Sequence, residues 1–146
     1  MSADFRITAR DGAPVALVEI KNRQNLSPDV AIQYRRNLLV HGALPRSSFF
    51  LLLSQDRGYI WKDASATDLD AAPTQTFPMS HVVERYSLIP SDGRLTGTAF
   101  ALLVLPWLND LSSGRRDDCQ EPETSLAQTG FLDAIRGGHV ELGVAA

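Results

Sequence analysis

Cysteine and lysine are scarce in this sequence of 146 residues, and long apolar runs are absent. The single cysteine, Cys119, excludes an internal disulfide framework and is typical of a reducing compartment. The longest apolar stretch, residues 99–105 and a little beyond, is about half of what a membrane-spanning helix needs. The first residues lead directly into Asp4 and Arg6, so they do not form the apolar segment of a signal peptide. We therefore expect a cytoplasmic protein with no membrane partner.

Charge is divided unevenly along the chain, although the net charge is only −3. Residues 1–62 contain nine Lys and Arg against five Asp and Glu, whereas residues 63–146 contain five against twelve. This asymmetry predicts a basic working face on the first half, as a nucleic-acid partner would require. The alternative is a surface charge that is uneven by chance.

Two strands joined by a tight turn are predicted at the start of the chain. Polar and apolar residues alternate over residues 3–9, which is typical of a half-buried strand. Residues 14–21 are apolar on both faces until Glu19, which is typical of a central strand. Asp11-Gly12 between them is a strong hairpin turn signal. The sequence therefore predicts a β-hairpin here.

The order of elements predicts an α/β (α+β) fold, with helices packed against a sheet. Ser27 and Pro28 are a typical helix cap and first helical residue. We expect one domain over residues 1–146, with a core at 3–62 and a C-terminal helical part at 79–136. The further elements predicted are a helix over 28–41, strands over 49–54 and 58–62, a loop over 63–78, and helices over 81–88, 98–111 and 123–136.

The hairpin brings two carboxylates together. A turn centred on Asp11-Gly12 pairs residues whose numbers sum to 23, so Asp4 lies opposite Glu19, and Lys21 shares the face of Glu19. Two like charges about 5 Å apart across a strand pair are destabilising. A divalent cation would remove this conflict, because hard cations take carboxylate oxygens. The alternative is an ordinary surface hairpin with a Glu-Lys pair.

Asp4, fourteen intervening residues and then Glu19-Ile20-Lys21 resemble the Asp…(Asp/Glu)-x-Lys signature of the PD-(D/E)XK nuclease superfamily. The resemblance covers about residues 3–62 and implies a restriction-endonuclease-like mixed sheet flanked by helices. It implies that Asp4, Glu19 and the carbonyl of Ile20 bind Mg²⁺ or Mn²⁺, and that Lys21 positions the attacking water.

The same resemblance makes Gln33, on the following helix, the residue that supports this site. The superfamily core normally begins with a helix before the Asp strand, and only three residues precede Asp4 here. We therefore expect the first core helix of the superfamily to be missing before Asp4. A truncation of the chain, a partner protein or a later helix of the same chain would account for its absence.

Basic residues near this core are candidates for contacts with phosphates. Arg23, Arg35 and Arg36 are the positions we select, because arginine forms bidentate bonds to phosphate. A solvated helix face is the alternative. The leading hypothesis is a Mg²⁺-dependent endonuclease acting on DNA, as a homo-oligomer or with a partner subunit. The alternatives are a non-catalytic nuclease-fold subunit for binding or assembly in DNA repair or mobile-element systems, and a plain protein-interaction domain.

Overall fold

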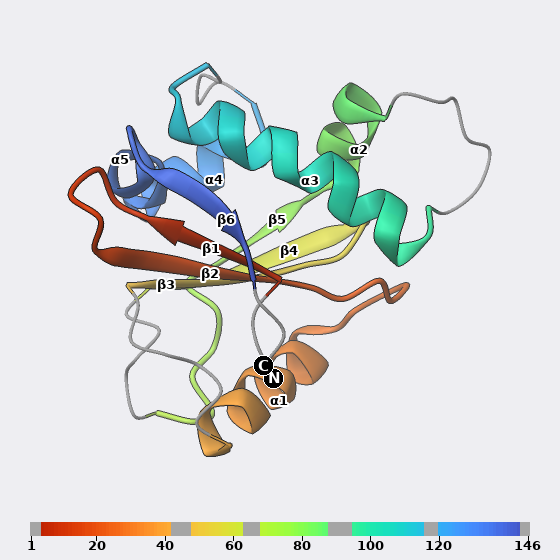
Figure 1. Ribbon diagram of the computed structural model, residues 1–146. Helices are drawn as coiled ribbons and strands as arrows, with labels where there is room; N and C mark the ends of the chain where they lie inside the picture. Colours follow the sequence, from red (N-terminus) through yellow and green to blue (C-terminus); the bar gives the residue numbers. More distant parts are fainter. Residues whose placement is uncertain (1–3, 42–47, 63–67, 88–94, 116–119, 144–146) are drawn as a thin grey trace.

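A six-stranded mixed β-sheet forms the centre of the computed structural model (Figure 1). Helix α1 covers one face of the sheet, and helices α2 to α5 lie over the other face. The sequence prediction of an α/β class is confirmed. The strands are β1 (Phe5–Thr8), β2 (Pro14–Ile20), β3 (Phe49–Leu53), β4 (Arg57–Lys62), β5 (Gln75–Pro78) and β6 (His139–Leu142). The helices are α1 (Pro28–Val40), α2 (Ser80–Tyr86), α3 (Gly97–Ser112), α4 (Glu123–Gln128) and α5 (Phe131–Ile135).

The strand order is β5-β4-β3-β2-β1-β6, and β2 and β3 are the parallel pair within it. The structure describes residues 4–41, 48–62, 68–87, 95–115 and 120–143. Cys119 lies outside these ranges. None of the helices in these ranges is long and apolar enough to cross a membrane.

The hairpin of β1 and β2 has the predicted register along most of its length. Phe5 pairs with Val18 and Ile7 pairs with Ala16, so the paired numbers sum to 23. The register shifts by one at Thr8, which pairs with Pro14, and leaves Val15 as an additional residue on β2. The turn is therefore not the simple two-residue loop that we expected. The bulge lies at the turn end of the hairpin, so it does not alter the register at the opposite end.

Helix α1 is the crossover that makes β2 and β3 parallel neighbours. The Ser27 hydroxyl oxygen accepts a hydrogen bond from the Val30 N–H at 3.3 Å, which caps the helix as predicted. Residues of β3 alternate between the two faces of the sheet: Phe50 and Leu52 pack under α1, while Leu51 packs on the opposite side. Because every β3 residue is buried, this strand lies at the centre of both cores.

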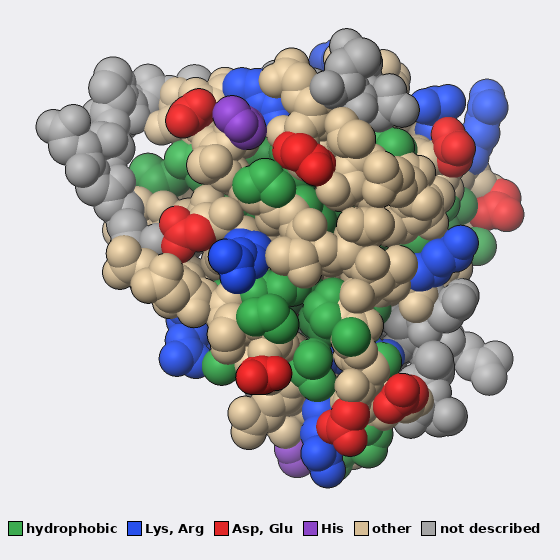
Figure 2. Space-filling model, turned by 180° about the vertical axis from the view of Figure 1, so that it is seen from behind, with side chains coloured by type: hydrophobic (Ala, Val, Ile, Leu, Met, Phe, Trp, Pro, Cys, Tyr) green, Lys and Arg blue, Asp and Glu red, His purple; other side chains and the backbone are tan. Residues whose placement is uncertain are grey.

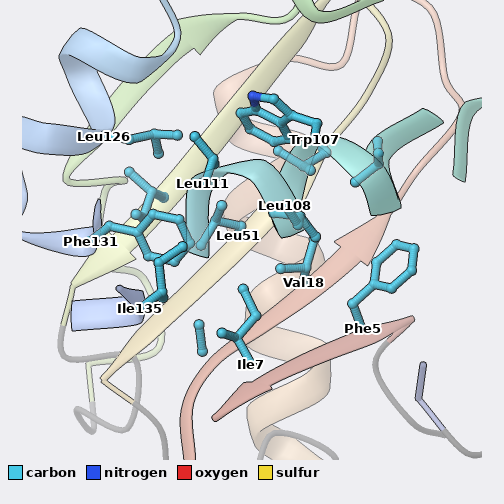
Figure 3. Packing of buried hydrophobic residues seen from close by; sticks show 14 of the residues in the cluster. Phe5, Ile7, Val18, Leu51, Trp107, Leu108, Leu111, Leu126, Phe131 and Ile135 are labelled. Atoms are coloured by element: carbon cyan, nitrogen blue, oxygen red, sulfur yellow. The ribbon is translucent and has the colours of Figure 1, made fainter. Parts of the chain in front are cut away.

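Helix α3 covers the face opposite α1. Figure 3 shows Trp107 and Leu108 of this helix above Val18 and Leu51 of the sheet. Pro106 lies inside α3, which runs from Gly97 to Ser112. Pro106 is exposed and leaves the carbonyl of Leu102 without its helical donor. Leu102 is itself exposed, so water can satisfy that carbonyl.

The C-terminal part differs from the sequence prediction in three ways. Residues 75–78 form β5 and not a loop, because they pair with β4 and bury Phe77 against the core. The predicted helix over 123–136 is two helices, separated at Gly130, whose φ of 85° is left-handed. The last strand, β6, was not predicted, and it pairs antiparallel with β1. A later strand and later helices therefore cover the edge and the face beside β1.

Candidate functional site

Asp4 and Glu19 lie together where β1 begins and β2 ends. The Asp4 Oδ2 accepts a hydrogen bond of 2.7 Å from the Ile20 N–H. The Asp4 backbone is also close enough to the Glu19 carboxyl to lower the pKa of that group. Extending the observed register by one residue beyond the Phe5 and Val18 pair also places Asp4 opposite Glu19. Backbone and side-chain contacts thus hold the two carboxyl groups at one end of the sheet.

The Glu19 carboxyl is in an unfavourable environment for a negative charge. Glu19 is only 8% exposed. Burial, followed by the nearby charge of Asp4, raises the pKa of Glu19 from its ordinary 4.5 to about 7. The hydrogen bond from Tyr34 and the charge of Lys21 act in the opposite direction and are weaker. At neutral pH Glu19 is therefore divided between its neutral and charged forms, and any added positive charge would favour the carboxylate.

Tyr34 of α1 is the helix residue that contacts this pair. Its hydroxyl donates to the Glu19 Oε1 at 3.2 Å. Burial, followed by the charge of Glu19, raises the pKa of Tyr34 to about 12. The hydroxyl therefore keeps its proton at every pH near neutrality. Tyr34 was not among the site residues that we predicted from the sequence. The available signal was a tyrosine on the sheet-facing side of the helix that follows a strand ending in Glu.

Gln33, the residue expected to support the site, lies elsewhere. It is exposed and lines a hollow on the outer side of α1 with Arg36, Asn37 and Asp70. Gln33 is about 100° from Tyr34 around the helix axis, and it lies on the side of α1 that is turned to solvent. The structure therefore places Tyr34, and not Gln33, against Glu19.

Lys21 completes the group on the α1 face of the sheet. Its Nζ lies 4.3 Å from the centroid of the Tyr34 ring, which is a cation–π distance. Its N–H donates to the Leu53 carbonyl at 2.8 Å and extends the parallel pairing one residue beyond β2. Lys21 is also close enough to Glu19 to lower the pKa of that carboxyl. Asp4, Glu19, Lys21 and Tyr34 thus form one contiguous cluster.

The cluster fits part of a magnesium site. Asp4 and Glu19 supply carboxylate oxygens, and the Ile20 carbonyl points toward the same side as the Ile20 N–H that Asp4 binds. Within the ranges that the structure describes, no three residues of the Asp, Glu, His and Cys types are grouped as metal ligands. Mg²⁺ is often held by one or two carboxylates together with water and substrate phosphates. The donors therefore suit Mg²⁺ or Mn²⁺ bound together with a phosphate, and they do not suit a four-ligand zinc site.

The three arginines selected for phosphate contacts have different environments. Arg35 is 1% exposed, donates to the Asp68 carbonyl at 3.0 Å and lies over the Trp61 ring, so this expectation is wrong for Arg35. Its stem and guanidinium fill the core between α1 and the sheet. Arg36 is exposed and pairs with Asp70 at 3.2 Å. Arg23 is exposed in the loop after β2 and is the one closest in sequence to Lys21.

The rear face of the molecule carries charges of both signs. Figure 2 shows acidic and basic side chains interspersed there, without a continuous basic surface among the residues drawn in colour. A nucleic acid would need clustered positive charge. Among the residues drawn in colour, this side therefore does not show the basic working face that was predicted from the first half of the sequence.

Comparisons of the chain with protein-family models, with curated proteins and with solved structures found no match. The likeness to the PD-(D/E)XK superfamily accordingly depends on the resemblance of residues 3–62, with Asp4, Glu19 and Lys21 as its signature.

Proposed function

We propose that this protein is a Mg²⁺-dependent nuclease of the PD-(D/E)XK type that hydrolyses phosphodiester bonds in DNA. The observation that supports the proposal is the convergence of Asp4, Glu19 and Lys21 at the ends of two adjacent strands. A protein gains no stability from two carboxyl groups in such proximity, one of them buried. A bound cation would offset the repulsion between the two carboxyl groups.

In hydrolysis, a water oxygen attacks phosphorus and the water gives up a proton, the bond from phosphorus to the leaving oxygen breaks, and the leaving oxygen takes up a proton. Mg²⁺, when bound, would supply positive charge to the phosphate and lower the pKa of a bound water. Lys21 is a compact ammonium group on the same face, suited to neutralising charge that develops on the phosphate. Tyr34 holds the Glu19 carboxyl by its hydroxyl and supports the Lys21 ammonium with its ring. These contacts orient both groups before a substrate arrives.

A second candidate is a non-catalytic nuclease-fold subunit that binds DNA or assembles with a partner. One observation favours it: the Asp4 carboxyl already accepts a hydrogen bond from Ile20, and the Glu19 carboxyl accepts one from Tyr34. Each carboxyl group therefore has a partner within the protein without a cation. Cleavage and metal binding distinguish the two candidates.

Cleavage of DNA is the direct test. We expect the protein to cut plasmid or single-stranded DNA with Mg²⁺ and to lose this activity with a chelator. Asp4→Asn should lose it as well, because an amide is a weaker cation ligand than a carboxylate. The matched control is Glu141→Gln, which removes an exposed carboxyl from the neighbouring strand β6. Absence of cleavage by a parent protein that binds the metal would favour the non-catalytic subunit.

Metal binding should be visible in the stability of the protein. A cation that binds only the folded state stabilises it by about 1.4 kcal/mol at ten times its dissociation constant. We expect the melting temperature to rise with Mg²⁺ or Mn²⁺ above pH 7, and to rise less below pH 5, where Glu19 is protonated. Glu19→Gln should abolish the rise and Glu141→Gln should preserve it. An equal response of the parent and Glu19→Gln would show that the metal binds elsewhere.

A further inference from the structure

Gln55, in the turn between β3 and β4, makes hydrogen bonds with every strong donor and acceptor of its side chain. The Leu95 N–H donates to its Oε1 at 2.9 Å. Its Nε2 donates to the Leu95 carbonyl at 2.8 Å and also to the Asn22 Oδ1. Gln55 is only 7% exposed, so these bonds have little competition from water. Because the Gln55 amide makes all of these hydrogen bonds, it holds together the segments to which it bonds.

The joined segments lie next to the candidate site. Asn22 follows Lys21 directly, and Leu95 precedes Thr96, the residue that caps α3. Asn22 also donates from its Nδ2 to the Leu95 carbonyl at 3.1 Å. Gln55, Asn22 and Leu95 therefore form a closed triangle, which connects the end of β2, the β3–β4 turn and the start of α3.

Lys21 lies just beyond the end of β2 at Ile20, so the strand itself does not hold it in place. The backbone of Lys21 makes one bond to Leu53, and its carbonyl accepts from the Arg23 N–H in a tight turn. The Lys21 Nζ lies over the Tyr34 ring, and four rotatable bonds separate it from the backbone. The Asn22 side chain bonds to Leu95 beside the start of α3, whereas the Lys21 ammonium group lies over Tyr34 of α1, on the other face of the sheet. An anchored Asn22 limits rotation of the adjoining peptide.

We propose that Gln55 is a positioning residue that acts through Asn22 and Leu95 to hold Lys21 over Tyr34 and beside Glu19. Its consequence for catalysis rests on the proposed nuclease function, whereas its effect on the position of Lys21 does not. Gln55 does not contact the reacting groups itself. Without it, we expect Lys21 to sample several positions and the ammonium group to spend less time at the site.

The position of Lys21 can be measured without any activity. Protons held above an aromatic ring shift upfield, so the ε-methylene protons of Lys21 should resonate upfield of those of Lys62, the second lysine of the chain. Tyr34→Leu defines the signal without the ring. We expect Gln55→Ala to lose most of the upfield shift. Gln75→Ala should retain it, because Gln75 lies on β5 and bonds to Gln128.

If Gln55→Ala does not fold, Asn22→Ala provides the same test from an exposed position. A folded variant with an unchanged Lys21 shift would overturn the proposal.

Cleavage assays on the same variants separate the two proposals. If the parent cleaves DNA, Gln55→Ala should lower kcat and leave KM nearly unchanged, because ground-state binding of DNA does not depend on Lys21 alone. An unchanged kcat in a variant with displaced Lys21 would overturn the role in catalysis. If the parent does not cleave, the nuclease proposal fails, and the NMR readout still decides whether Gln55 positions Lys21.

Discussion

Replacing Lys21 with alanine should lower the rate of DNA cleavage by about 10²–10³-fold, the usual cost of removing one preorganised electrostatic group. The affinity for DNA should change by no more than a few-fold. Lys21→Arg should be impaired as well, because a planar guanidinium cannot reproduce the approach of a compact ammonium to a phosphate or a bound water. The measurement is cleavage of plasmid and single-stranded DNA with Mg²⁺ at equal protein concentrations.

The chain offers a matched control for this experiment in Lys62, its second lysine, which is exposed at the end of β4. Lys62→Ala removes the same charge from the same sheet and should cleave like the parent. Equal cleavage by the parent and Lys21→Ala would contradict the proposed role of Lys21. Equal losses in both lysine variants would indicate a general effect of charge on DNA binding.

Replacing Glu19 with glutamine should flatten the dependence of stability on pH. The pKa of Glu19 is about 7 in the folded protein and 4.5 ordinarily, so the folded state binds the proton more tightly than the unfolded state. The stability associated with that proton is complete below pH 4.5 and is lost as the pH rises through 7. With 1.36 kcal/mol for each pKa unit, the loss is about 3 kcal/mol in total.

The test is the free energy of unfolding by urea, measured without divalent metal from pH 4 to pH 9. The difference between Glu19→Gln and the parent should be constant below pH 4.5 and should grow in favour of the variant up to about pH 8. Glu141→Gln, which removes an exposed carboxyl from the same sheet, tests whether the change belongs to Glu19. A constant difference over the whole range would show that Glu19 does not titrate as its environment implies.

Local signals account for what could be predicted around the site. Alternating side chains and the turn signal at Asp11-Gly12 specified a hairpin register that brings Asp4 to Glu19. The bulge at Val15 escaped prediction because a one-residue insertion changes few side chains and leaves the alternation readable on each side of it. The cap at Ser27 located the start of α1 because it depends on a bond between residues three apart.

Arg35 shows why the sequence could not predict which residues of α1 lie at the site and which are buried in the core. It looked like a surface cation, yet it fills the space beneath α1 next to Trp61. Gln33 and Tyr34 differ by one residue, and only the rotation of α1 on the sheet decides which of them meets Glu19. The helix is amphipathic over a broad arc, so the sequence pattern leaves that rotation undetermined.

The sequence by itself determined the hairpin, the helix that follows it and the three polar residues that converge at the end of β2, since each depends on contacts within about twenty residues. Only the tertiary structure decided what surrounds them. It placed the Tyr34 hydroxyl on Glu19, brought Leu95 to Gln55 across forty residues, and added β6 beside β1. Such contacts depend on which buried surfaces pack together, and many pairings of short apolar segments satisfy the same local pattern.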